Sequence, residues 1–238
     1  MTNSDRFILS YNRIDKTLRT VYSYKSHLNF IDIVKRTSPS NYIVKKYEQK
    51  LIDYARLRNA IIHQGEVDMV VAEPHTKVVE EFEYIEKLIC APPKALYSFA
   101  QREVVSLPHD ALLVDLIKIM YESQYSNIPI LEKHKLIGVA NNKLVIQSIA
   151  NALNKGVSID EYLRKTRACE ILSEDMMGIY YSVLSEEATL ARVMDEFEKN
   201  RKLVAVLITK SGNCLEKILC MITAYDIVEI SDILDKYE

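Results

Sequence analysis

The sequence predicts an α+β chain of several domains, with an all-helical front domain followed by a tandem α/β module. Up to about residue 90, apolar residues recur at the spacing of amphipathic helices. Beyond Pro92 and Pro93, short β-like runs alternate with helical stretches. This alternation occurs twice in the same order, which indicates a duplicated unit.

The front domain is expected to contain three helices, over residues 7–36, 42–64 and 75–89. Ser, Pro and Asn in residues 37–41 combine turn chemistry with an N-cap and predict the first break. Gly65 stands where the C-cap of the second helix is expected. Pro92 and Pro93 then mark the end of this domain.

Each copy of the duplicated unit is expected to hold a strand, a helix, a two-stranded hairpin and a closing helix. In the first copy these elements are placed at residues 104–107, 111–123, 127–131, 136–140 and 142–154. In the second copy they are placed at residues 178–184, 188–200, 203–209, 218–222 and 224–234. Alignment of Leu107 with Leu184 gives an offset of roughly 77 residues. Because one copy alone exposes an apolar sheet face, we expect the two copies to pack on each other.

Composition predicts a globular protein of the cytoplasm. Of the 238 residues, 48% are hydrophobic and 27% are charged, and five Gly and six Pro argue against low complexity. No window approaches the ~20 apolar residues of a membrane span, and residues 1–6 are polar, unlike a signal peptide. The four cysteines form no Cys-x-x-Cys pair, so we expect reduced thiols and no metal site. Because no apolar window is long enough to span a bilayer, we also expect no membrane association.

Charge is distributed unevenly along the chain. Residues 1–65 hold twelve Lys and Arg against five Asp and Glu, whereas the remainder holds 19 basic and 28 acidic residues. Such a split is typical of a surface that binds phosphates. It is equally typical of a Lys-rich helical face in solvent, and charge alone leaves both interpretations open.

The duplicated unit resembles a pair of CBS domains, a Bateman module, with copies at residues 95–155 and 170–238. Sequence motifs in both copies carry the resemblance: Val105-Ser106-Leu107-Pro108, Asn127-Ile128-Pro129-Ile130, Leu136-Ile137-Gly138-Val139, Val183-Leu184 and Met221-Ile222-Thr223-Ala224-Tyr225-Asp226. The resemblance implies an adenine nucleotide, such as AMP, ADP or ATP, as a regulatory ligand between the copies. No essential cofactor is implied.

In CBS pairs, a strand-end Thr or Ser contacts phosphate, and an Asp three residues later holds the ribose hydroxyls. Thr223 and Asp226 match this pattern, whereas Asn141 and Leu144 stand at the corresponding positions of the first copy. Because leucine cannot accept hydrogen bonds from a ribose, we expect a single nucleotide site. We expect two further residues to line it: Ile179 and Tyr180. The alternative is that Thr223 and Asp226 only cap the last helix, as a capping box does.

The second front helix ends with Arg58-Asn59 and, after three more residues, His63, in a motif that resembles the HEPN superfamily. The resemblance covers about residues 5–90 of a helical domain placed at residues 1–92, and catalytic HEPN domains are metal-independent, dimeric endoribonucleases. It implies that Arg58 stabilises the phosphorane, that His63 acts as general acid/base and that Asn59 supports them. Two alternatives remain open: a HEPN-like domain that binds without cutting, and a plain dimerisation domain in which both cations interact with helix carbonyls.

Two functions from different classes follow from these resemblances. The first is a ribonuclease whose activity is regulated by a nucleotide bound to the tandem module. The second is a non-enzymatic nucleotide sensor or adaptor whose helical domain binds RNA or protein. Both predict a homodimer. The sequence contains no P-loop and no Gly-rich dinucleotide motif, so ATP hydrolysis and redox chemistry are not expected.

Overall fold

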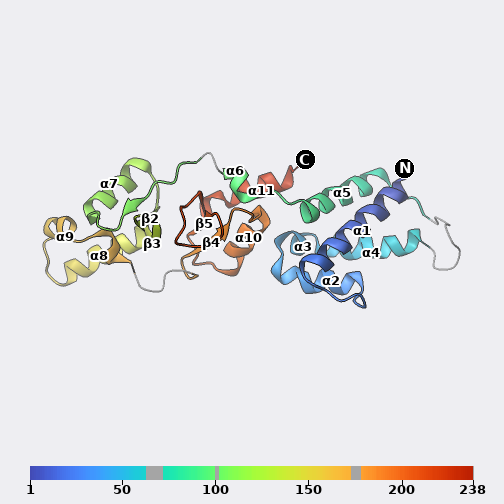
Figure 1. Cartoon of the computed structure of the whole chain (residues 1–238), viewed down its shortest axis with the longest axis horizontal. Helices are drawn as coiled ribbons and strands as arrows, with labels where there is room; N and C mark the ends of the chain where they lie inside the picture. Colours follow the sequence, from blue (N-terminus) through green and yellow to red (C-terminus); the bar gives the residue numbers. More distant parts are fainter. Residues whose placement is uncertain (63–71, 100–101, 173–177, 238) are drawn as a thin grey trace. The chain divides into compact units, whose positions relative to one another are not determined.

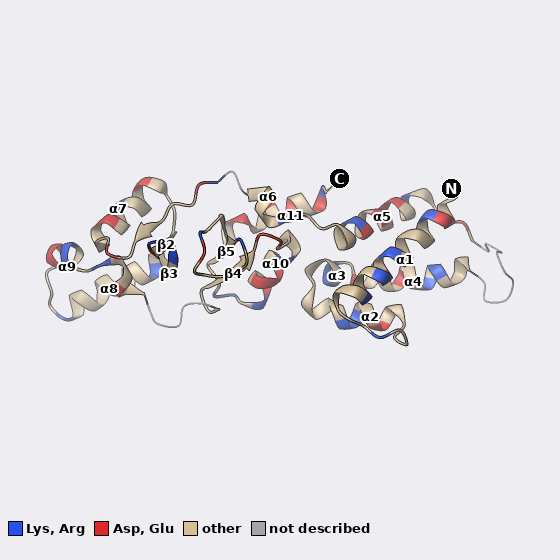
Figure 2. Ribbon diagram, in the orientation of Figure 1, with Lys and Arg blue, Asp and Glu red and all other residues tan. Residues whose placement is uncertain are grey.

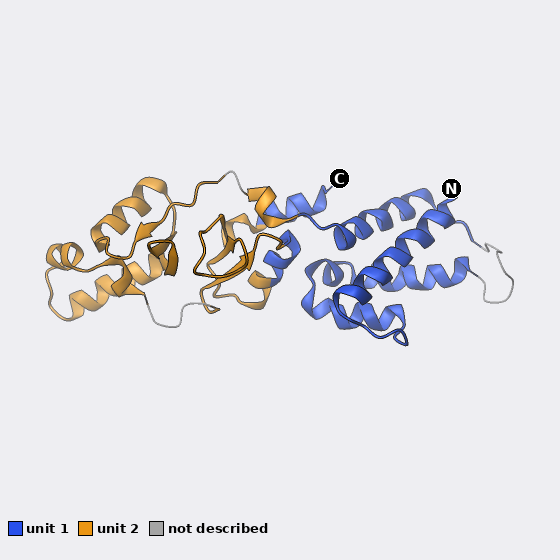
Figure 3. Ribbon diagram, in the orientation of Figure 1, with its two compact units in different colours: residues 1–93, 189–195, 228–238 blue, residues 94–188, 196–227 orange. Residues whose placement is uncertain are grey.

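The structure is a computed structural model that describes residues 1–62, 72–99, 102–172 and 178–237. The chain forms two compact units (Figure 3). Unit 1 comprises residues 1–93, 189–195 and 228–238, and unit 2 comprises residues 94–188 and 196–227. The predicted helical domain therefore lies in unit 1, together with parts of two helices from the second copy of the repeat.

Unit 1 is built mainly from five helices at the front of the chain (Figure 1). They are α1 (Asn3–Val21), α2 (Phe30–Thr37), α3 (Tyr42–Lys46), α4 (Glu48–Ile61) and α5 (Thr76–Cys90). The side chain of Thr2 caps α1 by accepting from the backbone N–H of Asp5, and Asp5 accepts in return from Thr2. Phe7, Tyr54 and Phe82 bring α1, α4 and α5 together in the core through ring contacts of 4.6–5.6 Å.

Two of the predicted front helices are each divided in the structure. The helix expected over residues 7–36 stops at Val21, Ser23 has a φ of 53°, and a new helix begins at Phe30. Asn29 starts that helix, because its side chain accepts from the backbone N–H of Asp32 at 2.9 Å. The helix expected over residues 42–64 is interrupted at Tyr47. The third helix, expected over residues 75–89, is confirmed as α5.

The end of the chain also belongs to unit 1. Its last helix, α11 (Ile227–Asp235), contacts α3 and α5. Lys46 pairs with Asp235 at 2.5 Å, and the hydroxyl of Tyr84 donates to the carbonyl of Leu234. The Tyr237 hydroxyl donates to the Ala91 carbonyl at 3.0 Å.

Unit 2 contains the whole first copy of the repeat. The elements of this copy are β1 (Leu107–Pro108), α7 (Leu113–Ser123), β2 (Asn127–Glu132), β3 (Lys135–Asn141) and α8 (Asn142–Asn154). β1 pairs in parallel with β2, which pairs antiparallel with β3. The predicted hairpin and the predicted closing helix are confirmed. The first strand is shorter than expected and begins at Leu107 rather than at residue 104.

The second copy has the same strand order, which confirms the internal repeat. Its elements are β4 (Tyr181–Ser185), α10 (Leu190–Lys199), β5 (Ala205–Thr209), β6 (Cys220–Thr223), the 3₁₀ turn η3 (Ala224–Asp226) and α11. Leu184 pairs with Ile208 as Leu107 pairs with Ile130. Buried residues of both sheets share one core within unit 2, as expected for copies that pack on each other: Leu136, Val139, Tyr181, Ala205, Leu207 and Ile218.

Two short helices were not predicted: α6 (Ala95–Phe99) and α9 (Ile159–Lys165). α6 precedes the first strand of the first copy in sequence, yet its neighbours belong to the second copy. The Ala95 N–H donates to the Ala188 carbonyl at 2.8 Å, and the Cys220 thiol lies 3.7 Å from the Phe99 carbonyl. Phe99 is therefore almost completely buried, although it lies ahead of the first strand of the repeat.

Within the described ranges, none of the helices combines the length and the apolar character needed to cross a bilayer.

Candidate functional site

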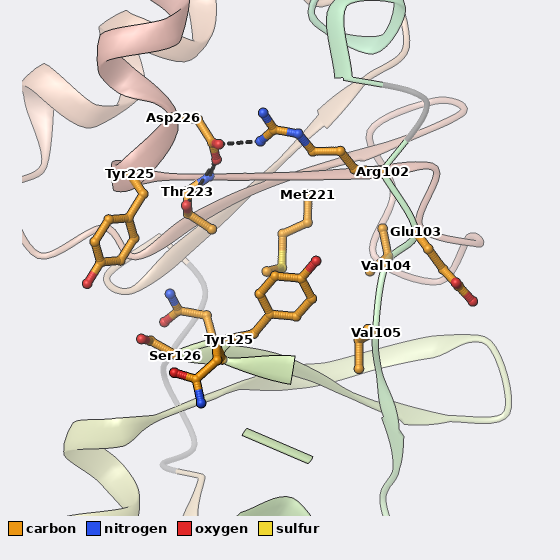
Figure 4. A pocket seen from close by; sticks show the side chains of 12 residues that line it. Arg102, Glu103, Val104, Val105, Tyr125, Ser126, Met221, Thr223, Tyr225 and Asp226 are labelled. Atoms are coloured by element: carbon orange, nitrogen blue, oxygen red, sulfur yellow. Dashed lines mark hydrogen bonds and ion pairs between the residues drawn. The ribbon is translucent and has the colours of Figure 1, made fainter. Parts of the chain in front are cut away.

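Unit 2 contains a cavity of about 400 Å³ that both copies of the repeat line (Figure 4). Its walls come from three segments: residues 102–105 ahead of β1, residues 124–127 at the start of β2, and residues 221–226 at the end of β6. The volume falls in the range of about 300–1,000 Å³ that is usual for small-molecule sites. We therefore treat this cavity as the candidate site.

Thr223 and Asp226, the two residues predicted to hold a nucleotide, lie together at one end of the cavity. Asp226 Oδ2 accepts from the Thr223 N–H at 2.7 Å and from the Thr223 hydroxyl at 3.0 Å. These bonds satisfy the start of the final helix, so the capping arrangement considered from the sequence is present. Capping and ligand binding are compatible here, because the same two side chains also line the cavity.

Arg102, which the sequence analysis did not single out, supplies the charge partner of Asp226. Its Nη1 donates to Asp226 Oδ1, the second oxygen of that carboxylate. The Arg102 guanidinium lies over the Phe99 ring, with its carbon 4.7 Å from the ring centre. The Asp226 side chain is 12% exposed and the Arg102 side chain 46%, so the pair is partly shielded from water. No local motif marks this pair, because 124 positions separate its members.

The remaining walls of the cavity offer apolar surface and aromatic rings. Val104, Val105 and Met221 are half-buried and line it, and Tyr125 stands beside Met221 (Figure 4). Tyr225 is 82% exposed at the end that holds Asp226. An apolar wall with rings suits a planar base, while the carboxylate and the guanidinium suit hydroxyls and an anion. The arrangement thus matches the parts of a nucleotide.

Ile179 and Tyr180, expected at the same site, are not brought to the cavity. Ile179 is 41% exposed, and its carbonyl accepts from the Asn200 side chain at 2.7 Å. Tyr180 packs against the shared core of the two sheets, and its carbonyl accepts from the Val204 N–H at 2.7 Å. Ile179 and Tyr180 thus make their contacts with the second copy and the shared core, away from the cavity.

In the first copy, the junction between the last strand, β3, and the closing helix, α8, has different residues. Asn141 Oδ1 accepts from the Leu144 N–H at 3.0 Å and so caps α8. Leu144 packs against the shared core, and neither residue lines the cavity. The first copy therefore presents no carboxylate at the position where the second presents Asp226.

In the helical domain, the structure describes only part of the Arg-Asn-His motif. Arg58 lies in the last turn of α4, with its guanidinium carbon 5.5 Å from the Tyr11 ring centre. Its Nη1 is 3.4 Å from the Asn59 side-chain oxygen, and its Nε is buried without a hydrogen-bond partner among the described residues. Asn59 is exposed. His63 lies outside the described residues.

The positive charge of the front segment is largely balanced inside unit 1. Residues 1–93 hold fourteen Lys and Arg against twelve Asp and Glu, because α5 adds acidic residues (Figure 2). Arg6 pairs with Glu83 at 2.6 Å and Arg13 with Glu86 at 3.4 Å. The excess counted over residues 1–65 therefore overstates the charge available to bind phosphates.

Comparison with known proteins bears on the first copy of the repeat. Residues 96–150 match the CBS domain family, which confirms the prediction of a CBS domain for the first copy. No curated protein matches the chain.

Three solved structures illustrate the likeness. A CBS domain of a membrane protein from Sphaerobacter thermophilus is 15% identical, with 64% of this chain and 97% of that chain covered and a TM-score of 0.49. The putative acetoin utilization protein AcuB from Vibrio cholerae is 14% identical, with coverages of 63% and 95% and a TM-score of 0.43. CBSX2 in complex with AMP is 10% identical, with coverages of 61% and 95% and a TM-score of 0.42. None of these matches supports the HEPN resemblance of the helical domain.

Proposed function

We propose that the cavity of unit 2 binds an adenine nucleotide and that its occupancy regulates the attached helical domain. The observation that carries the proposal is the Asp226 carboxylate, set beside Arg102 and Thr223 in a cavity with an apolar wall. The CBS match of residues 96–150 supports a regulatory role for the module.

Each part of the nucleotide has a candidate partner. Asp226 accepts from the two ribose hydroxyls, because an ionised carboxylate offers several acceptor sites. The base lies against Val104, Val105 and Met221, with Tyr125 available for stacking. The Thr223 hydroxyl donates to phosphate by giving up its bond to Asp226 Oδ2, which keeps the bond from the Thr223 N–H. Ile179 and Tyr180, which the sequence placed at this site, have no role in the proposal.

Binding is tested by isothermal titration with AMP, ADP and ATP, together with the melting temperature. A ligand at 100 times its Kd stabilises the folded state by about 2.7 kcal/mol, which raises the melting temperature measurably. The control is Lys94→Gln, because Lys94 pairs with Glu187 in the same unit but does not line the cavity. No heat and no thermal shift with any of the three nucleotides would refute the proposal.

A second candidate function concerns the helical domain: a metal-independent endoribonuclease formed by a homodimer, with Arg58, Asn59 and His63 in the roles given above. The end of α4 favours it, because Arg58 keeps part of its surface in solvent there and the neighbouring Asn59 is exposed. The purified chain is incubated with single-stranded RNA in EDTA, with and without AMP, beside a His63→Ala variant. Equal cleavage by both proteins removes the proposed role, and no cleavage favours the non-enzymatic sensor or adaptor.

A further inference from the structure

A second, smaller cavity of unit 2 lies at the hairpins of the two copies. Its volume is about 230 Å³, and six residues line it: Val104, Ser106, Leu131, His134, Lys217 and Ile218. The β2–β3 hairpin supplies two of them, and the stretch ahead of β6 supplies another two. Among these described residues only Val104 also lines the candidate nucleotide cavity, and neither Thr223 nor Asp226 contributes. The smaller cavity is therefore a separate site, which we call the hairpin cavity.

Backbone hydrogen bonds fix the walls of the hairpin cavity. The Leu136 N–H, which follows the turn of the first hairpin, donates to the Cys214 carbonyl in the β5–β6 connection at 3.0 Å. The Leu219 N–H donates to the Ile208 carbonyl of β5 at 2.7 Å, which holds the stretch that carries Lys217. The hairpin cavity is thus formed by paired backbone from both copies.

The inner wall of the hairpin cavity is apolar, and its mouth is basic. Ile218 is 8% exposed, and Val104 and Leu131 are half-buried. His134 and Lys217 are exposed. The Lys217 ammonium and a ring N–H of His134 are therefore available as donors at the mouth.

The charge at this mouth has no ion-pair partner in the described part of the chain. No Asp or Glu lines the cavity there, and Lys217 makes no ion pair. The adjacent Glu216 is engaged elsewhere, because its carboxylate accepts from the Ser211 N–H at 2.7 Å and from the Ser211 hydroxyl at 2.9 Å. The hairpin cavity thus presents a cation beside an apolar wall.

The size and the charge of the hairpin cavity restrict its ligand. If each non-hydrogen atom takes about 30 Å³, the share of one water molecule in the liquid, the volume accommodates roughly seven or eight such atoms. Among the described lining residues Lys217 alone carries a permanent charge, so a single negative charge matches it. A phosphate would lose hydration against the aliphatic wall, whereas a short alkyl chain is stabilised by burial there.

We propose that the hairpin cavity binds a short-chain monocarboxylate. The ligand's carboxylate accepts from the Lys217 ammonium and from the His134 ring N–H, while its alkyl chain lies against the apolar wall. This inference goes beyond the proposed nucleotide function and does not depend on it, because the two cavities use different polar residues.

The test is NMR titration of the isotope-labelled full chain, with butyrate as the probe. We expect saturable shifts of the amides around His134 and Lys217, with a Kd on the order of 1 mM. Acetate should bind about 10-fold more weakly, because it buries two methylene groups fewer. Butan-1-ol, which has the same alkyl chain without the charge, should also bind about 10-fold more weakly.

Variants of the cation at the mouth locate the binding. Lys217→Gln should weaken butyrate binding about 10-fold, and Lys217→Arg should retain most of it, because it keeps the charge. The matched control is Lys210→Gln, which removes an exposed cation of the same β5–β6 connection that does not line the cavity and should leave the affinity unchanged.

Three results would overturn the inference. The first is a set of shifts that grow with butyrate without saturating. The second is an equal Kd in wild type and Lys217→Gln, which would place the carboxylate elsewhere. The third is tighter binding of inorganic phosphate than of butyrate, because the apolar wall would then contribute nothing.

Discussion

The two copies of the repeat solve one structural problem in two ways. Each must satisfy the first amide groups of the helix that follows its last strand. The first copy does so with Asn141, which caps α8 and reaches no cavity. The second uses Asp226, whose carboxylate bonds back to Thr223 and also pairs with Arg102. A helix cap requires only a hydrogen-bond acceptor. The carboxylate of Asp226 is therefore the feature through which the two copies can differ in function.

The hairpins differ as well. The turn between β2 and β3 contains Lys133 at a φ of 57°, a left-handed conformation held by a residue with a side chain. The longer connection between β5 and β6 contains Gly212 at a φ of 85°. An added Cβ at Gly212 would lie 3.2 Å from the Ser185 nitrogen. The second copy is therefore the more constrained one, both at its hairpin and at its junction.

The largest expected difference concerns thiol reactivity. Burial raises the pKa of the Cys220 thiol to about 11 from its ordinary value of 9.0, and the Asp226 charge contributes. At pH 8 its thiolate fraction is then on the order of 100-fold below that of an ordinary thiol. Cys169, in the segment after the first copy, is only half-buried. Timed alkylation read by mass spectrometry should label Cys169 first. The rate of Cys220 alkylation should rise as the pH rises. Equal rates would contradict the burial of Cys220.

The next effect concerns the two junctions. Asp226→Asn should weaken AMP binding by ~10- to 100-fold, because hydrogen bonds to a charged group contribute about 1.5–3 kcal/mol. Asn141→Ala changes the corresponding junction of the first copy and should leave affinity unchanged. Isothermal titration measures both variants, and circular dichroism checks that each is folded. A comparable loss in Asn141→Ala would show that capping, rather than the carboxylate, supports binding.

A smaller effect is expected at the hairpins. Gly212→Ala should destabilise the protein by about 1–2 kcal/mol, because a side chain is disfavoured at positive φ. Lys133→Ala is the matched control, since that position already carries a side chain at positive φ, and its change should stay within ~0.5 kcal/mol. Urea unfolding compares the two variants. Equal stability would mean that the Gly212 turn relaxes.

The smallest effect is the loss of one helix cap. Asn141→Ala removes the side chain that accepts from the Leu144 N–H and should cost about 1 kcal/mol. Asn141→Asp keeps an acceptor there and should restore the stability. Urea unfolding measures both variants. An unchanged midpoint in Asn141→Ala would show that the Asn141 cap contributes nothing to α8.

Local patterns predicted the repeat well. The alternating β-like and helical patterns placed a helix at residues 142–154, the bounds that the structure shows for α8. They did not mark the break after Val21, because apolar residues continue at helical spacing on both sides of Ser23. Sequence also located Thr223 and Asp226, whose relation is local. Arg102 was missed because its partner is distant in the chain, and a long-range ion pair leaves no periodic signal.

The position of α6 has a consequence for where the modules of this chain begin and end. Ala95 bonds to Ala188, Phe99 is buried beside Cys220, and Arg102 bonds to Asp226. The second copy is thus completed by residues that precede the first strand of the first copy. A fragment cut at the borders of the sequence repeat, such as residues 170–238, would lack two of the three segments that line the cavity. The duplication visible along the chain is therefore not a pair of interchangeable blocks, since residues 94–99 and 102–105 contact both copies within unit 2.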